Sequence, residues 1–139
     1  YALTRSAESG ATLSKVCKIV CQAHQPDLVI AHGTGTVAND AMEDTAYRNL
    51  FGKKIPITCT KWSIGHTLGA SGAVDLIAAC EVLRSGQAFP IGNTEAADPE
   101  FGANYLTQNT FWNHPEPRRC LVASVGFGGM HAAAMVGRP

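Results

Sequence analysis

Apolar residues recur along the first part of the chain with two different patterns. In residues 11–25, ATLSKVCKIVCQAHQ, they return every three or four positions from Leu13 to Cys21, which predicts an amphipathic helix that a proline closes. DLVIA, residues 27–31, is a short continuous apolar run, typical of a strand covered on both faces. IPITCT, residues 55–60, predicts a second strand.

Two further segments have helical character. NDAMEDTAYRNLFG, residues 39–52, predicts a helix that Asn39 or Asp40 caps. TLGASGAVDLIAACEVLRSG, residues 67–86, predicts a third helix whose start is rich in small residues. The stretch 87–106 contains too many Pro, Gly, Asn and Asp residues for a regular element, so we expect a loop there.

The end of the chain shows the pattern of two paired strands. RRCLVASVG, residues 118–126, and MHAAAMVG, residues 130–137, are joined through a glycine-rich turn, which predicts an antiparallel hairpin. Helix, strand, helix, strand, helix and hairpin together indicate a layered α/β fold with a mixed β-sheet flanked by helices. At 139 residues we expect a single domain over positions 1–139.

Composition narrows the function classes. The 11 basic and 11 acidic residues cancel and no basic block occurs, which disfavours nucleic acid and anionic membrane as partners. Hydrophobic residues make up 45%, yet no stretch is long and apolar enough to span a bilayer. The five cysteines are odd in number and scattered singly, which favours reduced thiols and a cytoplasmic location.

Segments with candidate chemistry follow the predicted strands and begin at His32, Lys61 and Gly126. Ligands of open α/β sheets gather at the carboxyl ends of strands. If the first two strands are parallel, His32, Lys61 and His66 converge at one edge of the sheet. A neutral imidazole offers an N–H donor without net charge, which suits stabilisation of a developing oxyanion. A structural role is the commoner one for either histidine taken alone.

Other residues near these segments leave two interpretations open. Thr34 and Thr36 could hydrogen-bond the amides of an extended ligand or could only close a turn. Glu43 could pair with Lys61 or face solvent, as most helix acids do. The sequence lacks the glycine pattern of a phosphate-binding loop and the histidine spacing of a zinc site, so nucleotide and metal sites are disfavoured.

Three motifs carry a resemblance to a known family. AHGTGTVANDAMED, TKWSIGHTLGASGAVD and SVGFGGMH resemble, in this order, the first histidine motif, the lysine and second histidine motif and the closing glycine-rich turn of the β-ketoacyl-acyl-carrier-protein synthases. These condensing enzymes have the thiolase-like fold, and the resemblance is to their carboxyl-terminal half, from about residue 11 onward. It implies a thiolase-like half-fold.

The resemblance also implies a reaction, a decarboxylative Claisen condensation of malonyl-carrier protein with an acyl thioester. By position, His32 and His66 would donate hydrogen bonds to the malonyl thioester oxygen. Lys61 matches the lysine that supports the second histidine, and Glu43 matches an acid near that lysine. The family's nucleophilic cysteine lies on its amino-terminal half, and none of the five cysteines here has such a context. We therefore expect this chain alone to be inactive.

The remaining matched positions concern substrate binding and partners. Thr34 and Thr36 match threonines that touch the pantetheine arm, and Phe127 matches a gating phenylalanine whose backbone N–H helps form the oxyanion hole. No metal and no separate cofactor is implied, because the substrates are carried on the phosphopantetheine of acyl carrier protein. The implied partners are that carrier protein and an amino-terminal ketosynthase half, on the same or a separate chain, in a homodimer or heterodimer.

Three positions depart from the family pattern. Met130 and His131 stand where threonine and asparagine are usual, and Trp62 replaces a small polar residue. These changes favour a specialised synthase of polyketide or secondary-metabolite type over a housekeeping one, while the choice between fatty acid and polyketide synthesis stays open. Two alternatives remain: a non-catalytic partner that resembles a chain-length factor, and an unrelated glycine-rich module that binds anions. Retention of both histidines and the lysine favours the enzyme.

Overall fold

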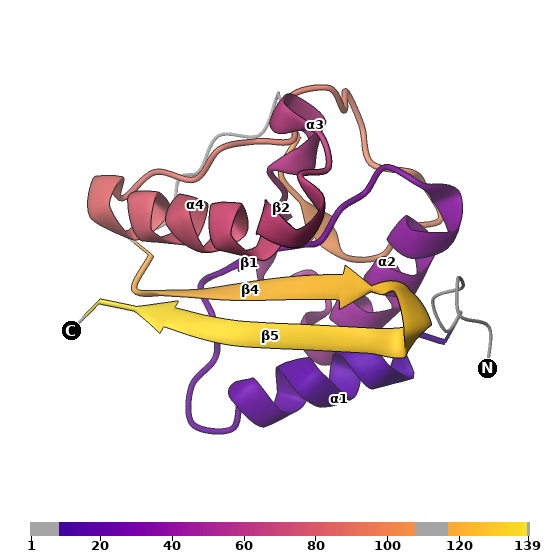
Figure 1. Cartoon of the computed structure of the whole chain (residues 1–139), viewed down its shortest axis with the longest axis horizontal. Helices are drawn as coiled ribbons and strands as arrows, with labels where there is room; N and C mark the ends of the chain where they lie inside the picture. The colour runs from indigo at the N-terminus through magenta and orange to yellow at the C-terminus, as the bar shows by residue number, and fades with distance from the viewer. Residues whose placement is uncertain (1–8, 108–116, 139) are drawn as a thin grey trace.

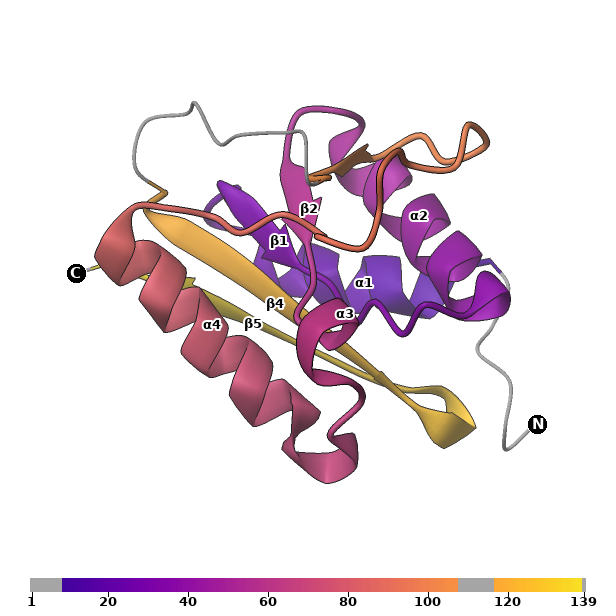
Figure 2. The same cartoon turned by 90° about the horizontal axis from the view of Figure 1, so that it is seen from above.

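A computed structural model describes residues 9–107 and 117–138 of the protein. Within these residues the chain forms one five-stranded sheet in the order β3-β2-β1-β4-β5, with helices on both faces (Figure 1, Figure 2). Its elements are α1 (Ala11–Val20), β1 (Leu28–Ile30), α2 (Val37–Phe51), β2 (Pro56–Thr58), α3 (Lys61–Ile64), η1 (Leu68–Ala70), α4 (Ser71–Ser85), β3 (Asn104–Tyr105), β4 (Arg119–Gly126), η2 (Phe127–Gly129) and β5 (Met130–Gly137).

The sheet is mixed, as the sequence predicts. β1 runs parallel to β2 and to β4, and Val29 of β1 lies beside Ile57 of β2. β4 and β5 form the predicted antiparallel hairpin, in register from Arg119 opposite Gly137 to Gly126 opposite Met130. The condition for convergence, parallel pairing of the first two strands, is therefore met, and their following loops leave the sheet at the same edge.

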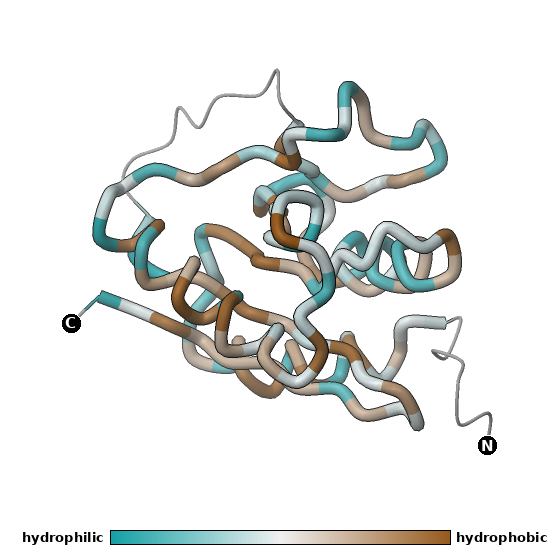
Figure 3. The backbone as a smooth tube through the Cα atoms, turned by 45° about the horizontal axis from the view of Figure 1, so that its top comes forward, coloured by the Kyte–Doolittle hydropathy of each residue, from teal (hydrophilic) through white to brown (hydrophobic). Residues whose placement is uncertain are grey.

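Two hydrophobic clusters cover the two faces of the sheet. Successive strand residues point to opposite faces, so Val29 and Ala31 pack under α1 and α2, whereas Leu28 and Ile30 pack under α4. Burial on both faces explains why the first strand reads as a continuous apolar run. Figure 3 shows hydrophobic stretches along α4 and the central strands. None of the helices in the described part is long and apolar enough to cross a membrane.

The predicted element boundaries need several corrections. α1 ends at Val20, because the polar turn before Pro26 leaves the helix early. α2 begins at Val37, so neither expected cap is the N-cap; Thr36 occupies that position, and the side chain of Asn39 is used inside the helix instead.

Short elements occur where the sequence predicts no separate helix or strand. The segment 61–66 contains the single turn α3, and the predicted helix 67–86 is broken at its start into η1 and α4. The predicted loop 87–106 contains β3, whose neighbour Leu106 donates its N–H to the carbonyl of Ile57 at 2.8 Å. These elements have no periodic pattern of their own, and contacts with the sheet stabilise them.

Candidate active site

His32 lies directly beyond β1, and a buried carboxylate holds its backbone. The N–H groups of His32 and Gly33 donate to the two oxygens of Glu43, at 2.9 and 2.7 Å. The hydroxyl of Tyr47 donates to Oε1 at 2.8 Å, and the amide of Asn39 donates to Oε2 at 2.7 Å. Burial raises the pKa of the Glu43 carboxyl, and these four donors oppose that rise. When every hydrogen-bond partner of a carboxyl group is a donor, the ionised form of that group is favoured.

Lys61 is paired with an aspartate of α4. Its ammonium group is buried and lies 3.1 Å from Oδ2 of Asp75, whose Oδ1 accepts the hydroxyl of Thr60 at 2.5 Å. The sequence left open whether Glu43 pairs with Lys61 or faces solvent; in the structure Glu43 is buried, and both of its oxygens accept N–H groups of the turn after β1. Asp75 lies in the second turn of α4, which packs on the other face of the sheet.

His66 lies between α3 and η1 and has a defined tautomer. Its Nδ1 accepts the backbone N–H of Leu68 at 3.0 Å, and the hydroxyl of Ser71 lies 3.4 Å away. Since Nδ1 accepts, a neutral ring carries its proton on Nε2, which leaves that N–H available as a donor. Leu68 has a φ of 52°, a left-handed conformation that costs about 1–2 kcal/mol in a non-glycine residue. In this conformation the backbone N–H of Leu68 points at Nδ1 of His66.

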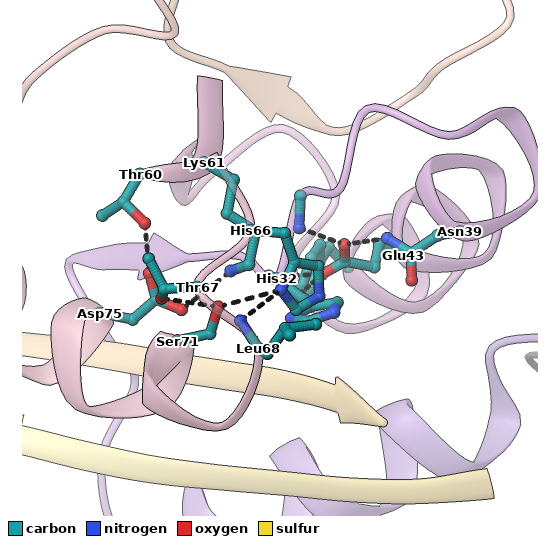
Figure 4. Close-up of polar contacts among 12 residues, drawn as sticks. His32, Asn39, Glu43, Thr60, Lys61, His66, Thr67, Leu68, Ser71 and Asp75 are labelled. Atoms are coloured by element: carbon teal, nitrogen blue, oxygen red, sulfur yellow. Dashed lines mark hydrogen bonds and ion pairs between the residues drawn. The ribbon is translucent and has the colours of Figure 1, made fainter. Parts of the chain in front are cut away.

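The two imidazoles meet at the edge of the sheet. The ring centroids of His32 and His66 lie 5.2 Å apart, at an interplanar angle of 83° (Figure 4). His32 is 4% exposed, whereas His66 is open to solvent. Burial first, and then the charges of Lys61, His66 and His131, together lower the pKa of His32 to about 4. His32 is therefore neutral at physiological pH.

The other predicted site residues lie on adjacent loops. The hydroxyls of Thr34 and Thr36 lie 2.9 Å apart on the loop between β1 and α2. Phe127 lies at the tip of the β4–β5 hairpin with 77% of its surface exposed. The structure thus places His32 in ring contact with His66 and close enough to Lys61 for their charges to interact. The two threonines and Phe127 lie at the periphery of this group.

Sequence reasoning missed Asp75, Thr60, Asn39 and Tyr47. Of these four, Asp75 could most readily have been recognised as a site residue from the sequence, because it is the single acid inside the apolar stretch AVDLIAA. A carboxylate in such a stretch needs a buried cation or several donors. Tyr47 lies four residues after Glu43, so the two share one face of α2, but that spacing alone does not reveal which loop they hold.

The departures near the closing turn have different environments. Met130 is 69% exposed, beside the equally open Phe127. His131 pairs with Val125 across the hairpin, and among the described residues neither of its ring nitrogens has a hydrogen-bond partner, although both are buried. Burial lowers the pKa of His131, which favours a neutral ring.

These features define a class of protein. A layered α/β domain carries two histidines and a buried lysine–aspartate pair at the carboxyl edge of parallel strands. Residues 3–95 match the family described as Beta-ketoacyl synthase, C-terminal domain. The chain belongs to this family, and its fold is thiolase-like.

Individual relatives agree with this assignment. The chain is 37% identical over 114 residues to the tetracenomycin polyketide synthase ketoacyl synthase alpha subunit of Streptomyces glaucescens, a match that covers 78% of this chain and 26% of the relative. The chain thus spans about a quarter of that relative's length.

Two solved structures show the same fold. One contains a type II polyketide synthase acyl-carrier protein in complex with its ketosynthase bound to the hexaketide. It matches with a TM-score of 0.89 at 24% identity, over 100% of this chain and 36% of that one. The other is the ishigamide ketosynthase/chain length factor, with a TM-score of 0.88 at 22% identity, over 98% of this chain and 35% of that one.

Proposed function

We propose that the chain is the carboxyl-terminal part of a condensing enzyme that joins malonyl-carrier protein to an acyl thioester with loss of carbon dioxide. The observation that carries this proposal is the edge-to-face pair of His32 and His66, with ring centroids 5.2 Å apart. Two ring N–H donors side by side fit the single oxygen of a thioester that gains negative charge.

The proposed chemistry uses these donors in the decarboxylation. The bond between the malonyl carboxylate and its α-carbon breaks, carbon dioxide leaves, and the electron pair moves onto the thioester oxygen as an enolate. N–H groups of His32 and His66 stabilise that oxygen more in the transition state than in the ground state. The enolate carbon then attacks the acyl thioester, and the cysteine thiolate of the amino-terminal part leaves.

Lys61 and Asp75 support the pair electrostatically. The buried ammonium group of Lys61 opposes protonation of His32, which keeps that ring neutral. Asp75 holds the ammonium group in place at 3.1 Å. The backbone N–H of Phe127 is proposed to complete an oxyanion hole for the acyl carbonyl, as its family position implies.

The nucleophile is proposed to come from an amino-terminal part. Burial raises the pKa of Cys17 and Cys120 to about 12 and that of Cys59 to about 11, which keeps these groups as unreactive thiols. The relative from Streptomyces glaucescens is also about four times as long as the matched region. This chain by itself is therefore proposed to be unable to form the acyl-enzyme.

Exposed apolar side chains support the same inference. Leu68 and Ile77 on the α4 side, and Phe127 and Met130 on the hairpin, are each at least 69% exposed. On the hairpin, Phe127 and Met130 are close in the chain and both exposed, a pairing that another protein surface would cover. The amino-terminal part of the synthase is the proposed occupant.

The substrates are proposed to arrive on acyl carrier protein. Thr34 and Thr36 lie on the open loop beside His32, where they can hydrogen-bond the amides of a pantetheine arm. The solved ketosynthase that binds its acyl-carrier protein supports this partner, and the ketosynthase/chain length factor supports a dimer. Similarity to a tetracenomycin synthase subunit favours polyketide over fatty acid synthesis.

The alternative is a non-catalytic partner of a ketosynthase, which the similarity to a ketosynthase/chain length factor keeps open. The complete protein, incubated with malonyl-carrier protein and an acyl thioester, separates the two. The enzyme releases carbon dioxide and forms a 3-oxoacyl product in equal amounts. The non-catalytic partner by itself releases no carbon dioxide. Carbon dioxide then appears only when a second subunit is added.

A further inference from the structure

A second space lies behind the loop that carries His32. A cavity of about 340 Å³ opens between α2, the end of β2 and the segment that follows α4. Gly33 and Glu43 line this cavity, whereas His32 and His66 are not among its lining residues. It therefore adjoins the candidate active site and shares Gly33, Thr34, Glu43 and Lys61 with it, while the two histidines lie outside its lining.

Trp62 forms one wall of the cavity. Its indole ring lies directly on Gly92, where a methyl group would come within 2.5 Å of Cη2 of the ring. The large ring thus fits because residue 92 has no side chain. Trp62 is also the position at which this sequence departs from the small polar residue of the resembled family, so the wall is a feature of this chain.

The lining combines aromatic rings with carboxylates. Trp62, Phe101 and Tyr105 all line the cavity, and the centroids of the last two rings lie 5.8 Å apart. Asp40 lies on the α2 side, and Asp98 lies on the opposite segment. Aromatic faces are negative in their quadrupole, so rings and carboxylates attract the same kind of ligand.

The positive charge at the cavity is already neutralised. Lys61 also lines the space, but its ammonium group is paired with Asp75 at 3.1 Å. Burial raises the pKa of the Asp40 carboxyl, and hydrogen bonds from the Asn39 side chain and the Gly35 backbone oppose that rise, so a cation beside the carboxylate would offset the remaining electrostatic cost. An anion would be repelled, and a purely apolar ligand would desolvate the carboxylates without compensation.

We propose that this cavity binds a small organic cation, an ammonium group on an apolar body. Trp62 supplies the aromatic face, Asp40 supplies the charge, and Asp98 lies at the solvent-exposed side. The volume is within the range of small-molecule pockets, about 300–1,000 Å³. This site goes beyond the proposed condensation and does not require it, because its test measures binding and not turnover.

Isothermal titration of the complete protein tests the charge requirement. Choline is compared with 3,3-dimethyl-1-butanol, which has the same shape without the charge. Choline is expected to bind about tenfold or more tightly than the neutral alcohol, since a desolvated cation–π contact contributes up to about 2 kcal/mol. Equal affinity for both compounds would overturn the proposal.

Variants locate the binding in the cavity. Trp62→Leu keeps an apolar wall but removes the π face, and we expect it to weaken choline binding about 3- to 30-fold. Trp62→Phe is expected to retain most of the affinity. Asp40→Asn is expected to weaken binding, whereas Glu81→Gln, the same change in charge on the exposed face of α4, should leave it unchanged.

Two further outcomes would contradict the site. One is wild-type choline affinity in both Trp62→Leu and Asp40→Asn, with a wild-type circular dichroism spectrum. The other is the absence of saturable binding by all of choline, isopentylamine and phenethylamine. Neither result depends on whether the complete protein decarboxylates malonyl-carrier protein, so failure of this proposal and failure of the proposed function are distinguishable.

Discussion

Asp75 neutralises the buried ammonium group of Lys61, and both side chains are at most 3% exposed. Removal of one partner from a buried ion pair leaves the other charge without compensation, at a cost of about 3–5 kcal/mol. We expect Asp75→Asn to lower the free energy of unfolding by about that amount, measured by denaturant titration of the complete protein. Glu81→Gln, in an exposed pair on the same helix, should change it little. Equal effects of the two variants would contradict a structural role for the buried pair.

His32 gives the stability a predictable pH dependence. The unfolded chain binds a proton at this ring below about pH 6.5, whereas the pKa in the folded protein is about 4. Acid therefore favours the unfolded state, and stability falls as the pH drops from about 6.5 to 4, by up to about 3 kcal/mol. Above about pH 6.5 the ring is neutral in both states, and the full contribution of His32 to the free energy of unfolding is present.

A His32→Gln variant isolates this contribution, because it removes the titrating ring and keeps a polar side chain. Its free energy of unfolding, measured between pH 4 and 7, should fall less steeply with acid than that of the wild-type protein. His24→Ala, at an exposed histidine, should keep the wild-type slope. An unchanged slope in His32→Gln would show that the ring is not held neutral by the fold.

At the scale of elements, the turn between β1 and α2 has little room. Gly33 has a φ of 49°, and a methyl group there would lie 2.6 Å from Cβ of Cys59. Gly35 has a φ of 73° with nothing within 4 Å. Gly35→Ala should therefore cost only backbone strain, about 1–2 kcal/mol. Gly33→Ala should cost about 1–3 kcal/mol more from the steric clash. Thermal unfolding of both variants measures the difference, and equal costs would contradict the close packing.

Elements with a pattern of their own could be predicted from the sequence, whereas those without one could not. The helix at 11–20 has apolar periodicity, the strand at 28–30 lies in a continuous apolar run, and the hairpin has its turn glycines. α3 and β3 have four and two residues, too few for a periodic pattern. They form because Trp62 packs on Gly92 and because β3 pairs with β2.

The sequence predicted which histidines meet in the candidate site, but not which residues hold them and Lys61 in place. The meeting of His32 and His66 followed from two parallel strands whose loops share one edge. The partner of Lys61 depends on how α4 packs against α3, which is a tertiary contact that the sequence pattern does not encode. The role of Glu43 was missed for the same reason, since two of its four donors are backbone N–H groups of the loop after β1 and only the other two lie on α2.

At the scale of the whole molecule, this chain supplies the donors, and a further part is proposed to supply the nucleophile. The paired rings of His32 and His66 both belong to this chain, and apolar side chains such as Leu68 remain exposed. The division predicts that acyl transfer to the cysteine and decarboxylation of malonyl-carrier protein respond separately to substitutions in this chain.

The most direct test is the rate of malonyl-carrier protein decarboxylation by the complete protein carrying His32→Ala or His66→Ala. Each variant should lose about 100- to 1,000-fold in rate, the usual effect of removing one oxyanion donor, while acyl transfer to the cysteine continues. His24→Ala is the matched control and should retain the wild-type rate. Wild-type decarboxylation in both the His32 and His66 variants would contradict the proposal that the paired imidazoles stabilise the enolate.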